Sequence, residues 1–210
     1  MTDFVGQVLR EADALSILEL VAFLLGGLYL LLAIRESIWC WLCAFISSSI
    51  FAYLFFRSYI YMDAALQIFY AAMAIYGWYR WRGGGGGSSE VPVLRWPFAP
   101  HAIALSAVLV ASLLSGFLLE RHTDARYPYI DSATTFASLW ATFLVARKVL
   151  ENWWYWLVID SVSIAIYVER GLEFAALLFA VYVVMIPFGL VAWTRSFRAS
   201  EPAYNPGSTP

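Results

Sequence analysis

The sequence predicts an all-α polytopic membrane protein. Of its 210 residues, 62% are hydrophobic and only 13% are charged, whereas soluble domains carry about 25% charged residues. The apolar residues occur in long blocks rather than in amphipathic stripes, and several blocks reach the roughly 20 residues that a helix needs to cross a bilayer. These observations predict seven transmembrane helices.

The apolar blocks and the segments between them predict the order of the chain. Segment 1–13 contains one Arg and three acids, so we expect the first block to be a retained helix and not a signal peptide. We expect a linker containing Gly and Ser at 82–99, a polar loop at 120–129 and a flexible tail at 194–210. The spans are expected at about 14–34, 38–56, 60–81, 100–119, 130–150, 152–168 and 172–193.

The distribution of Lys and Arg predicts the orientation in the membrane. Counted on alternate sides of the spans, one side has eight of these residues and the other has five. The richer side is expected to be cytoplasmic, which places the N-terminus outside and the C-terminus inside. The richer side holds Arg35, Arg80, Arg82, Arg95, Arg147, Lys148, Arg195 and Arg198.

A pattern in the third span recurs in the seventh. Its two copies contain Arg57, Ala64-Ala65-Leu66, Gly77 and Trp81, and Arg170, Ala175-Ala176-Leu177, Gly189 and Trp193. This predicts a three-helix repeat over 14–81, a linking helix over 100–119 and a second repeat over 130–193. Such a parallel 3+1+3 repeat places a substrate site at the repeat interface near mid-membrane. The alternative is chance similarity between apolar helices, which share few residue types.

The segment 152–160, Asn-Trp-Trp-Tyr-Trp-Leu-Val-Ile-Asp, contains the clearest functional pattern. Trp153, Trp156 and Asp160 are spaced i, i+3 and i+7, so a helix places them on one face. A buried anion beside aromatic rings suits a flat organic cation. The alternative for Asp160 is a neutral acid that bonds to a helix carbonyl or to a serine.

Other polar residues within spans are open to two interpretations. Glu19 is the second acid in a span, and either a structural or a functional role fits it. Gln67 and Tyr70 share a face of the third span, where Gln67 either contacts a ligand or joins two helices by a hydrogen bond. Trp39 and Trp41 begin the second span, where anchoring at the membrane interface is expected.

The sequence indicates no metal site, cofactor or catalytic group. Cys40 and Cys43 form a Cys-x-x-Cys inside an apolar span with no other cysteine in the chain, so we expect them to be small packing residues. His101 and His122 are the only histidines, and both lie near expected helix ends. We expect the lipid bilayer and a small molecule as partners, and no nucleic acid.

Two motifs together resemble the PnuC family of vitamin transporters. These are Leu66-Gln67-x-x-Tyr70 with Tyr76-Gly77-Trp78-x-x-Trp81, and Glu151-Asn152-Trp153-x-x-Trp156-x-x-x-Asp160. The similarity runs over about 18–193 and implies a SWEET-like bundle, a homotrimer in the bacterial inner membrane, and facilitated diffusion with trapping of the substrate by a cytoplasmic kinase. It also implies that Gln67, Tyr70, Trp153, Trp156 and Asp160 surround the ligand.

The expected function is therefore transport of a cationic vitamin precursor, with nicotinamide riboside first and thiamine as the alternative. Asp160 leaves both open, because the family pattern associated with nicotinamide riboside has Asn there, and a pyridinium and a thiazolium both suit a carboxylate. An uncharged flavin suits it less. A membrane-embedded enzyme or a channel is a more distant alternative, since no nucleophile with a base is visible.

Overall fold

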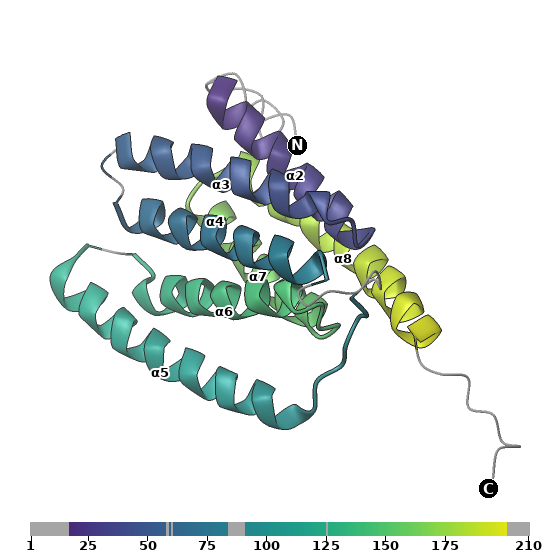
Figure 1. The fold of residues 1–210 in the computed structure, drawn as a ribbon. Helices are drawn as coiled ribbons and strands as arrows, with labels where there is room; N and C mark the ends of the chain where they lie inside the picture. The colour runs from purple at the N-terminus through teal and green to yellow at the C-terminus, as the bar shows by residue number, and fades with distance from the viewer. Residues whose placement is uncertain (1–16, 58, 60, 84–90, 125, 201–210) are drawn as a thin grey trace, which may run out of the picture.

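The computed structural model describes residues 17–57, 59, 61–83, 91–124 and 126–200 (Figure 1). The expected segment 1–13, the glycine-rich middle of the linker and the last ten residues of the tail lie outside these ranges. Within them the chain forms seven helices, which confirms the all-α prediction. The helices are α2 (Ile17–Ile34), α3 (Trp39–Arg57), α4 (Tyr61–Trp81), α5 (Phe98–His122), α6 (Pro128–Ala146), α7 (Asn152–Glu169) and α8 (Glu173–Ser200).

Two helices are longer than the hydropathy pattern predicted. Helix α5 extends beyond both ends of 100–119, which shortens the loop expected at 120–129. Helix α8 continues to Ser200, so the expectation of a flexible tail from residue 194 was wrong for 194–200. Hydropathy locates the end of the apolar block, whereas helical geometry continues past it to Ser200.

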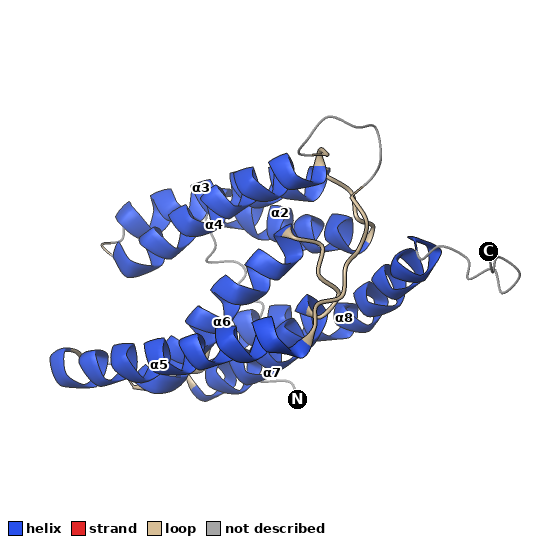
Figure 2. Cartoon of the chain, turned by 60° about the horizontal axis from the view of Figure 1, so that its bottom comes forward, coloured by secondary structure: helices blue, strands red, loops and turns tan. Residues whose placement is uncertain are grey.

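The helices form two triplets that close into a ring. Helices α2, α3 and α4 pack in order, as do α6, α7 and α8 (Figure 2). The ring closes because α4 packs on α6 and α8 packs on α2, so the first helix of each triplet contacts the third helix of the other. Helix α5 packs along α6 on the outside of the ring (Figure 1). This is the predicted 3+1+3 arrangement, and it is compatible with a SWEET-like bundle.

The two triplets share local backbone geometry at a constant spacing of 112 residues. Glu36 and Lys148 have φ values of 55° and 52°, and Tyr59 and Gly171 have φ values of 63° and 70°. The hydrogen bonds repeat as well: the Glu36 N–H donates to the Ala33 carbonyl at 3.0 Å, and the Lys148 N–H donates to the Val145 carbonyl at 2.9 Å. The repeat is therefore present in the backbone.

The structural register corrects two of the sequence pairings. At a spacing of 112, the buried Ala64 corresponds to the buried Ala176 and not to Ala175. Arg57 corresponds to Glu169 and not to Arg170. The glycines and tryptophans were paired correctly.

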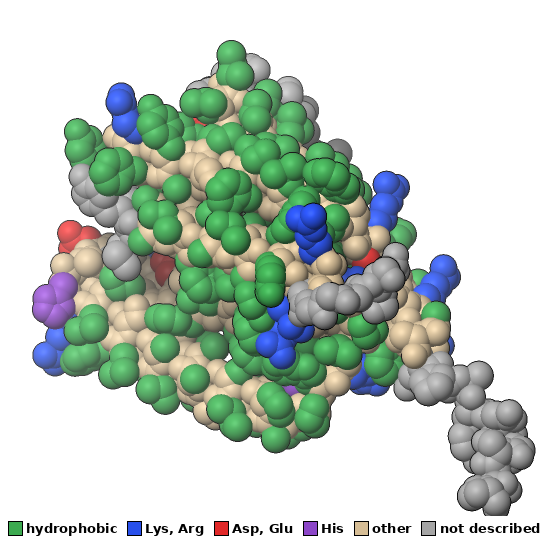
Figure 3. Space-filling model, in the orientation of Figure 1, with side chains coloured by type: hydrophobic (Ala, Val, Ile, Leu, Met, Phe, Trp, Pro, Cys, Tyr) green, Lys and Arg blue, Asp and Glu red, His purple; other side chains and the backbone are tan. Residues whose placement is uncertain are grey.

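Four of the described helices are long and apolar enough to cross a membrane by composition: α2, α3, α5 and the part of α8 from Ala175. Large apolar side chains cover their outer faces (Figure 3). The other three helices, α4, α6 and α7, are more polar. Part of that polarity points inward, because α6 and α7 bury the polar side chains of Ser132, Ser138, Thr142, Asn152, Asp160 and Ser163.

Tryptophans join the two triplets at the end of the bundle where α4 and α8 carry Trp81 and Trp193. The Trp81 Nε1–H donates to the Ala146 carbonyl at 3.2 Å, and the Trp193 Nε1–H donates to the Ala33 carbonyl at 3.0 Å. Each indole therefore bonds to the opposite triplet. The two rings lie 6.0 Å apart, so they meet where the triplets meet.

A second pair of tryptophans packs inside the triplets, one in each. A methyl group added to Gly77 would overlap the Trp41 indole, and one added to Gly189 would overlap the Trp153 indole. Trp41 is only 2% exposed, so the prediction that it anchors the protein at the membrane interface was wrong, whereas Trp39 is 57% exposed. The physical reason is the glycine on α4, which opens space for an indole that hydropathy alone assigns to the interface.

Candidate functional site

Helix α7 presents the predicted face to the interior. Trp153 and Asp160 are 2% and 3% exposed, and Trp156 is half-buried. Trp154 and Val158, on the opposite face, are 57% and 63% exposed. The i, i+3, i+7 spacing therefore indicated the inward face of this helix.

The Asp160 carboxylate is buried without a counter-charge. Among the residues that the structure describes, it makes no hydrogen bond and no ion pair. An ionised carboxylate in a membrane interior costs at least about 2.5 kcal/mol on insertion scales. Such a group marks a place where a cation or a hydrogen-bonding ligand compensates the lost hydration.

Polar side chains from both triplets gather near Asp160. Tyr182 on α8 lies level with Asp160 on α7, because Trp153 packs against Gly189 and each of the two residues is seven positions from that contact on the paired helices. On α2, Gly26 packs near the Tyr182 hydroxyl and Tyr29 follows one turn later, and the Tyr70 hydroxyl on α4 lies near the Ser138 side chain on α6. Five helices thus contribute to one polar centre.

The polar centre lies deeper in the membrane than the tryptophan junction. Asp160 is seven residues beyond Trp153, which is about 10 Å along α7 at 1.5 Å per residue. Tyr182 precedes Trp193 by eleven residues, and Tyr70 precedes Trp81 by the same number, so both lie about 16 Å from the junction. The tryptophans therefore close one end of the bundle beneath the polar centre.

Gln67 and Glu19 occupy different places relative to this centre. Gln67 is half-buried on α4, one turn from Tyr70, and it makes no hydrogen bond within the described part of the chain. Glu19 lies in the first turn of α2, ten residues before Tyr29, which is about 15 Å along the helix. The structure brings Gln67 near the polar centre and leaves Glu19 at the other end of α2.

The two predicted aromatic ligands differ in packing. The Trp153 ring lies against Gly189 and meets Trp193 edge-to-face at 5.5 Å and 88°. Its contacts in the structure are packing contacts that match those of Trp41. Trp156, one turn further along α7, packs on the edge of the core and is half-buried. Ligand contact by either ring stays a prediction.

Sequence reasoning missed Tyr29 and Tyr182. Tyr182 lies 112 residues after Tyr70, so a repeat comparison in the correct register would have identified it. No such signal exists for Tyr29, because its counterpart is Ala141. Its place beside the other two tyrosines follows only from the packing of α2.

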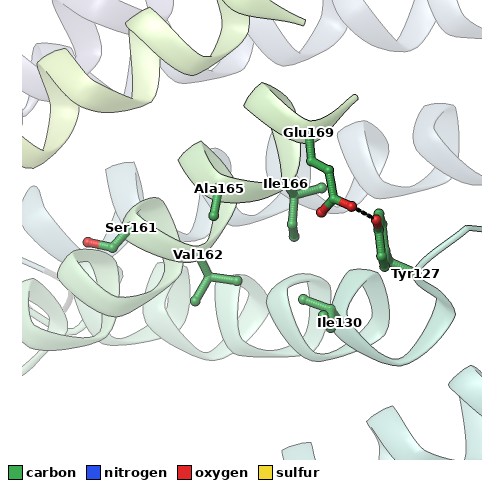
Figure 4. A pocket seen from close by; sticks show the side chains of 7 residues that line it. All are labelled: Tyr127, Ile130, Ser161, Val162, Ala165, Ile166 and Glu169. Carbon is green, nitrogen blue, oxygen red and sulfur yellow. Dashed lines mark hydrogen bonds between the residues drawn. The ribbon is translucent and has the colours of Figure 1, made fainter. Parts of the chain in front are cut away.

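One surface pocket is separate from the polar centre. It has a volume of about 340 Å³ and lies on the outer side of α6 and α7, lined by Tyr127, Ile130, Ser161, Val162, Ala165, Ile166 and Glu169 (Figure 4). At its edge the Tyr127 hydroxyl donates to Glu169, and this bond raises the pKa of Tyr127. None of the six predicted site residues lines it, and its lining is mostly apolar, so we assign the site by the chemistry around Asp160.

The described residues contain no cluster of three or more His, Cys, Asp or Glu side chains that could hold a metal ion. Cys40 and Cys43 are buried free thiols. His101 instead bonds the Tyr155 hydroxyl at 3.1 Å and stacks on its ring. Tyr155 thus belongs to a junction between α5 and α7 and not to the polar centre.

Known proteins resemble this chain over most of its length. It is 28% identical over 210 residues to the nicotinamide riboside transporter PnuC of Escherichia coli (strain K12), covering 88% of this chain and 87% of that protein. It is 26% identical over 190 residues to the riboflavin/roseoflavin transporter RibM of Streptomyces davaonensis, covering 88% of each. Each relative supports a transporter and not an enzyme.

A solved structure shares the fold. The crystal structure of the vitamin B3 transporter PnuC matches with a TM-score of 0.69 at 20% identity, covering 94% of this chain and 90% of that chain. Residues 16–195 match the family described as nicotinamide mononucleotide transporter. These findings confirm the resemblance drawn from the two motifs: the chain is a multi-pass membrane protein that belongs to the nicotinamide mononucleotide transporter family.

Proposed function

We propose that this protein is a facilitative carrier for a cationic vitamin precursor, with nicotinamide riboside as the first candidate and thiamine as the second. The observation that carries the proposal is the buried Asp160, which has no hydrogen bond or ion pair among the described residues. A pyridinium or thiazolium bound beside it would supply the missing charge. Flat rings of this kind also suit the neighbouring indole of Trp156.

The relatives support a vitamin-like substrate. The carboxylate of Asp160 favours one kind of vitamin, the cationic kind, over the other. One relative is named for nicotinamide riboside and another for riboflavin and roseoflavin. An uncharged flavin would leave a desolvated carboxylate without compensation. The charge of Asp160 therefore favours the cationic substrate.

In the proposed complex each predicted residue has a distinct role. Trp156 stacks on the aromatic ring, with Trp153 holding the floor of the site below it, and Asp160 balances the positive charge. Gln67 and Tyr70 hydrogen-bond the polar groups of the ligand. Glu19, at the far end of α2, would meet the cation at the entrance.

Rocking of the two triplets about this centre would give alternating access. We infer that the tryptophan end faces the cytoplasm, because that side carries eight Lys and Arg residues against five on the other, which leaves the N-terminus outside in the bacterial inner membrane. The carrier itself would need no energy source if a cytoplasmic kinase traps the substrate. We also propose a homotrimer.

A binding screen tests the function. Purified protein in detergent is titrated by calorimetry with nicotinamide riboside, thiamine and riboflavin, and saturable uptake is measured in liposomes. We expect binding of at least one cationic ligand, weak or no binding of riboflavin, and uptake that saturates. Tight riboflavin binding without cation binding would reject the assignment, and flux that does not saturate would indicate a channel.

A further inference from the structure

Two tyrosines occupy equivalent places in the two triplets. Tyr70 on α4 and Tyr182 on α8 are 112 residues apart, which is the spacing that relates the backbone of the two triplets. Each lies on the third helix of its triplet, where that helix meets the first helix of the other. Both are partly buried and both approach Tyr29.

The residues that the two hydroxyls face are different. The Tyr70 hydroxyl lies near the Ser138 side chain on α6. The residue equivalent to Ser138 on α2 is Gly26, and a methyl group built there would lie 3.6 Å from the Tyr182 hydroxyl oxygen. Tyr182 therefore faces a glycine at the place where Tyr70 has a serine side chain nearby.

The other polar groups around Tyr182 leave its hydroxyl open. Ser47 lies nearby, 3.8 Å from the same methyl position, where its hydroxyl donates to the Ala22 carbonyl at 2.7 Å and makes no hydrogen bond with Tyr182. Within the described part of the chain, the Tyr182 hydroxyl makes no hydrogen bond. A partly buried hydroxyl without a protein partner favours a ligand that supplies one.

We propose that Tyr182 is a further substrate-contacting residue, whose hydroxyl hydrogen-bonds a polar group of the cationic ligand beside the charge that Asp160 balances. Gly26 contributes to this contact, because the absence of a side chain there leaves the Tyr182 hydroxyl free to bind the ligand. The inference rests on the proposed function, since it names an additional contact for the same ligand. It gives the site one tyrosine from each triplet, Tyr70 on α4 and Tyr182 on α8, and of the two only Tyr182 has a glycine at the equivalent facing position.

The test uses calorimetric titration of the full chain in detergent with nicotinamide riboside. Tyr182→Phe removes only the hydroxyl, and we expect about tenfold weaker binding. Gly26→Ser places a hydroxyl at the position that Ser138 occupies in the other triplet, and its Cβ fits because 3.6 Å is an ordinary contact distance. It should also weaken binding, and adding Tyr182→Phe to it should weaken binding no further than Tyr182→Phe alone.

Tyr79→Phe is the matched control, because Tyr79 is 66% exposed on the outer face of α4. Unchanged affinity in Tyr182→Phe, an equal loss in Tyr79→Phe, or a thermal midpoint that collapses in Tyr182→Phe would each overturn the inference. If the wild-type protein binds nicotinamide riboside while Tyr182→Phe binds it equally well, only the inference fails. If the wild-type protein binds no cationic vitamin, the proposed function fails and the inference fails with it.

Discussion

The two triplets share their packing residues and differ in the residues that carry chemistry. At the spacing of 112, Gly77 corresponds to Gly189, Trp41 to Trp153 and Trp81 to Trp193, and each pair makes the same contacts. In contrast, Asp160 corresponds to Ser48, Trp156 to Ala44 and Gln67 to Phe179. The shared residues pack each triplet and join the two. Packing that both triplets need does not explain the residues that occur in only one of them.

This comparison separates two roles within one motif. Trp153 and Trp156 are three residues apart on the same helix, yet only Trp153 has an aromatic counterpart in the first triplet. Because Trp41 makes the same packing contact in the first triplet, which has no acidic counterpart of Asp160, the contacts of Trp153 are explained by the scaffold. Trp156 has no such explanation, and we expect its contribution to lie in ligand binding.

The largest effect is expected from filling the space that a shared glycine leaves for an indole. Gly189→Ala would place a methyl group inside the Trp153 ring, and we expect it to lower the free energy of unfolding by about 3 kcal/mol. Gly77→Ala should do the same through Trp41. Gly27→Ala is the control, because open space surrounds that position and alanine favours a helix. Thermal unfolding in detergent measures the three; equal midpoints would contradict the scaffold role.

A smaller but more specific effect is expected at the charge that distinguishes the triplets. Asp160→Asn keeps the shape and removes the charge, so the affinity for a cationic vitamin should fall about thirtyfold, in line with loss of a charged contact worth about 2 kcal/mol. Ser48→Ala, at the equivalent buried position, and Tyr155→Phe should leave affinity nearly unchanged. Calorimetry compares them; tighter binding of nicotinamide riboside by Asp160→Asn would show that the carboxylate serves another substrate.

The smallest effect is expected from variants that separate the role of Trp156 from that of Trp153. Trp156→Ala should weaken ligand binding about tenfold, since a stacked ring contributes about 1–3 kcal/mol, with little change in the unfolding midpoint. Trp153→Phe should lower the midpoint because it empties space over Gly189. Titration and thermal unfolding of both variants give a two-by-two comparison. The same pattern in both variants would mean that the motif acts as one unit.

Local patterns in the sequence were enough to predict the helices and the inward face of α7. Seven apolar blocks became seven helices, and the spacing of Trp153, Trp156 and Asp160 indicated which side of α7 is buried. It also revealed the existence of the repeat through Gly77 and Gly189. These features depend on hydropathy and on helical periodicity, which are local properties of the chain.

Which residues of different helices contact one another became clear only from the packing of the helices. The register of 112, the burial of Trp41 and the approach of α2 to Tyr182 depend on contacts between helices, which the spacing along one helix does not contain. From sequence, a tryptophan near a helix end is predicted to anchor the protein at the membrane interface. Trp41 is buried instead, because a glycine on the neighbouring helix leaves space for its ring. Likewise a buried carboxylate signals a site, but the partners around it are set by packing between helices and not by the spacing along one of them.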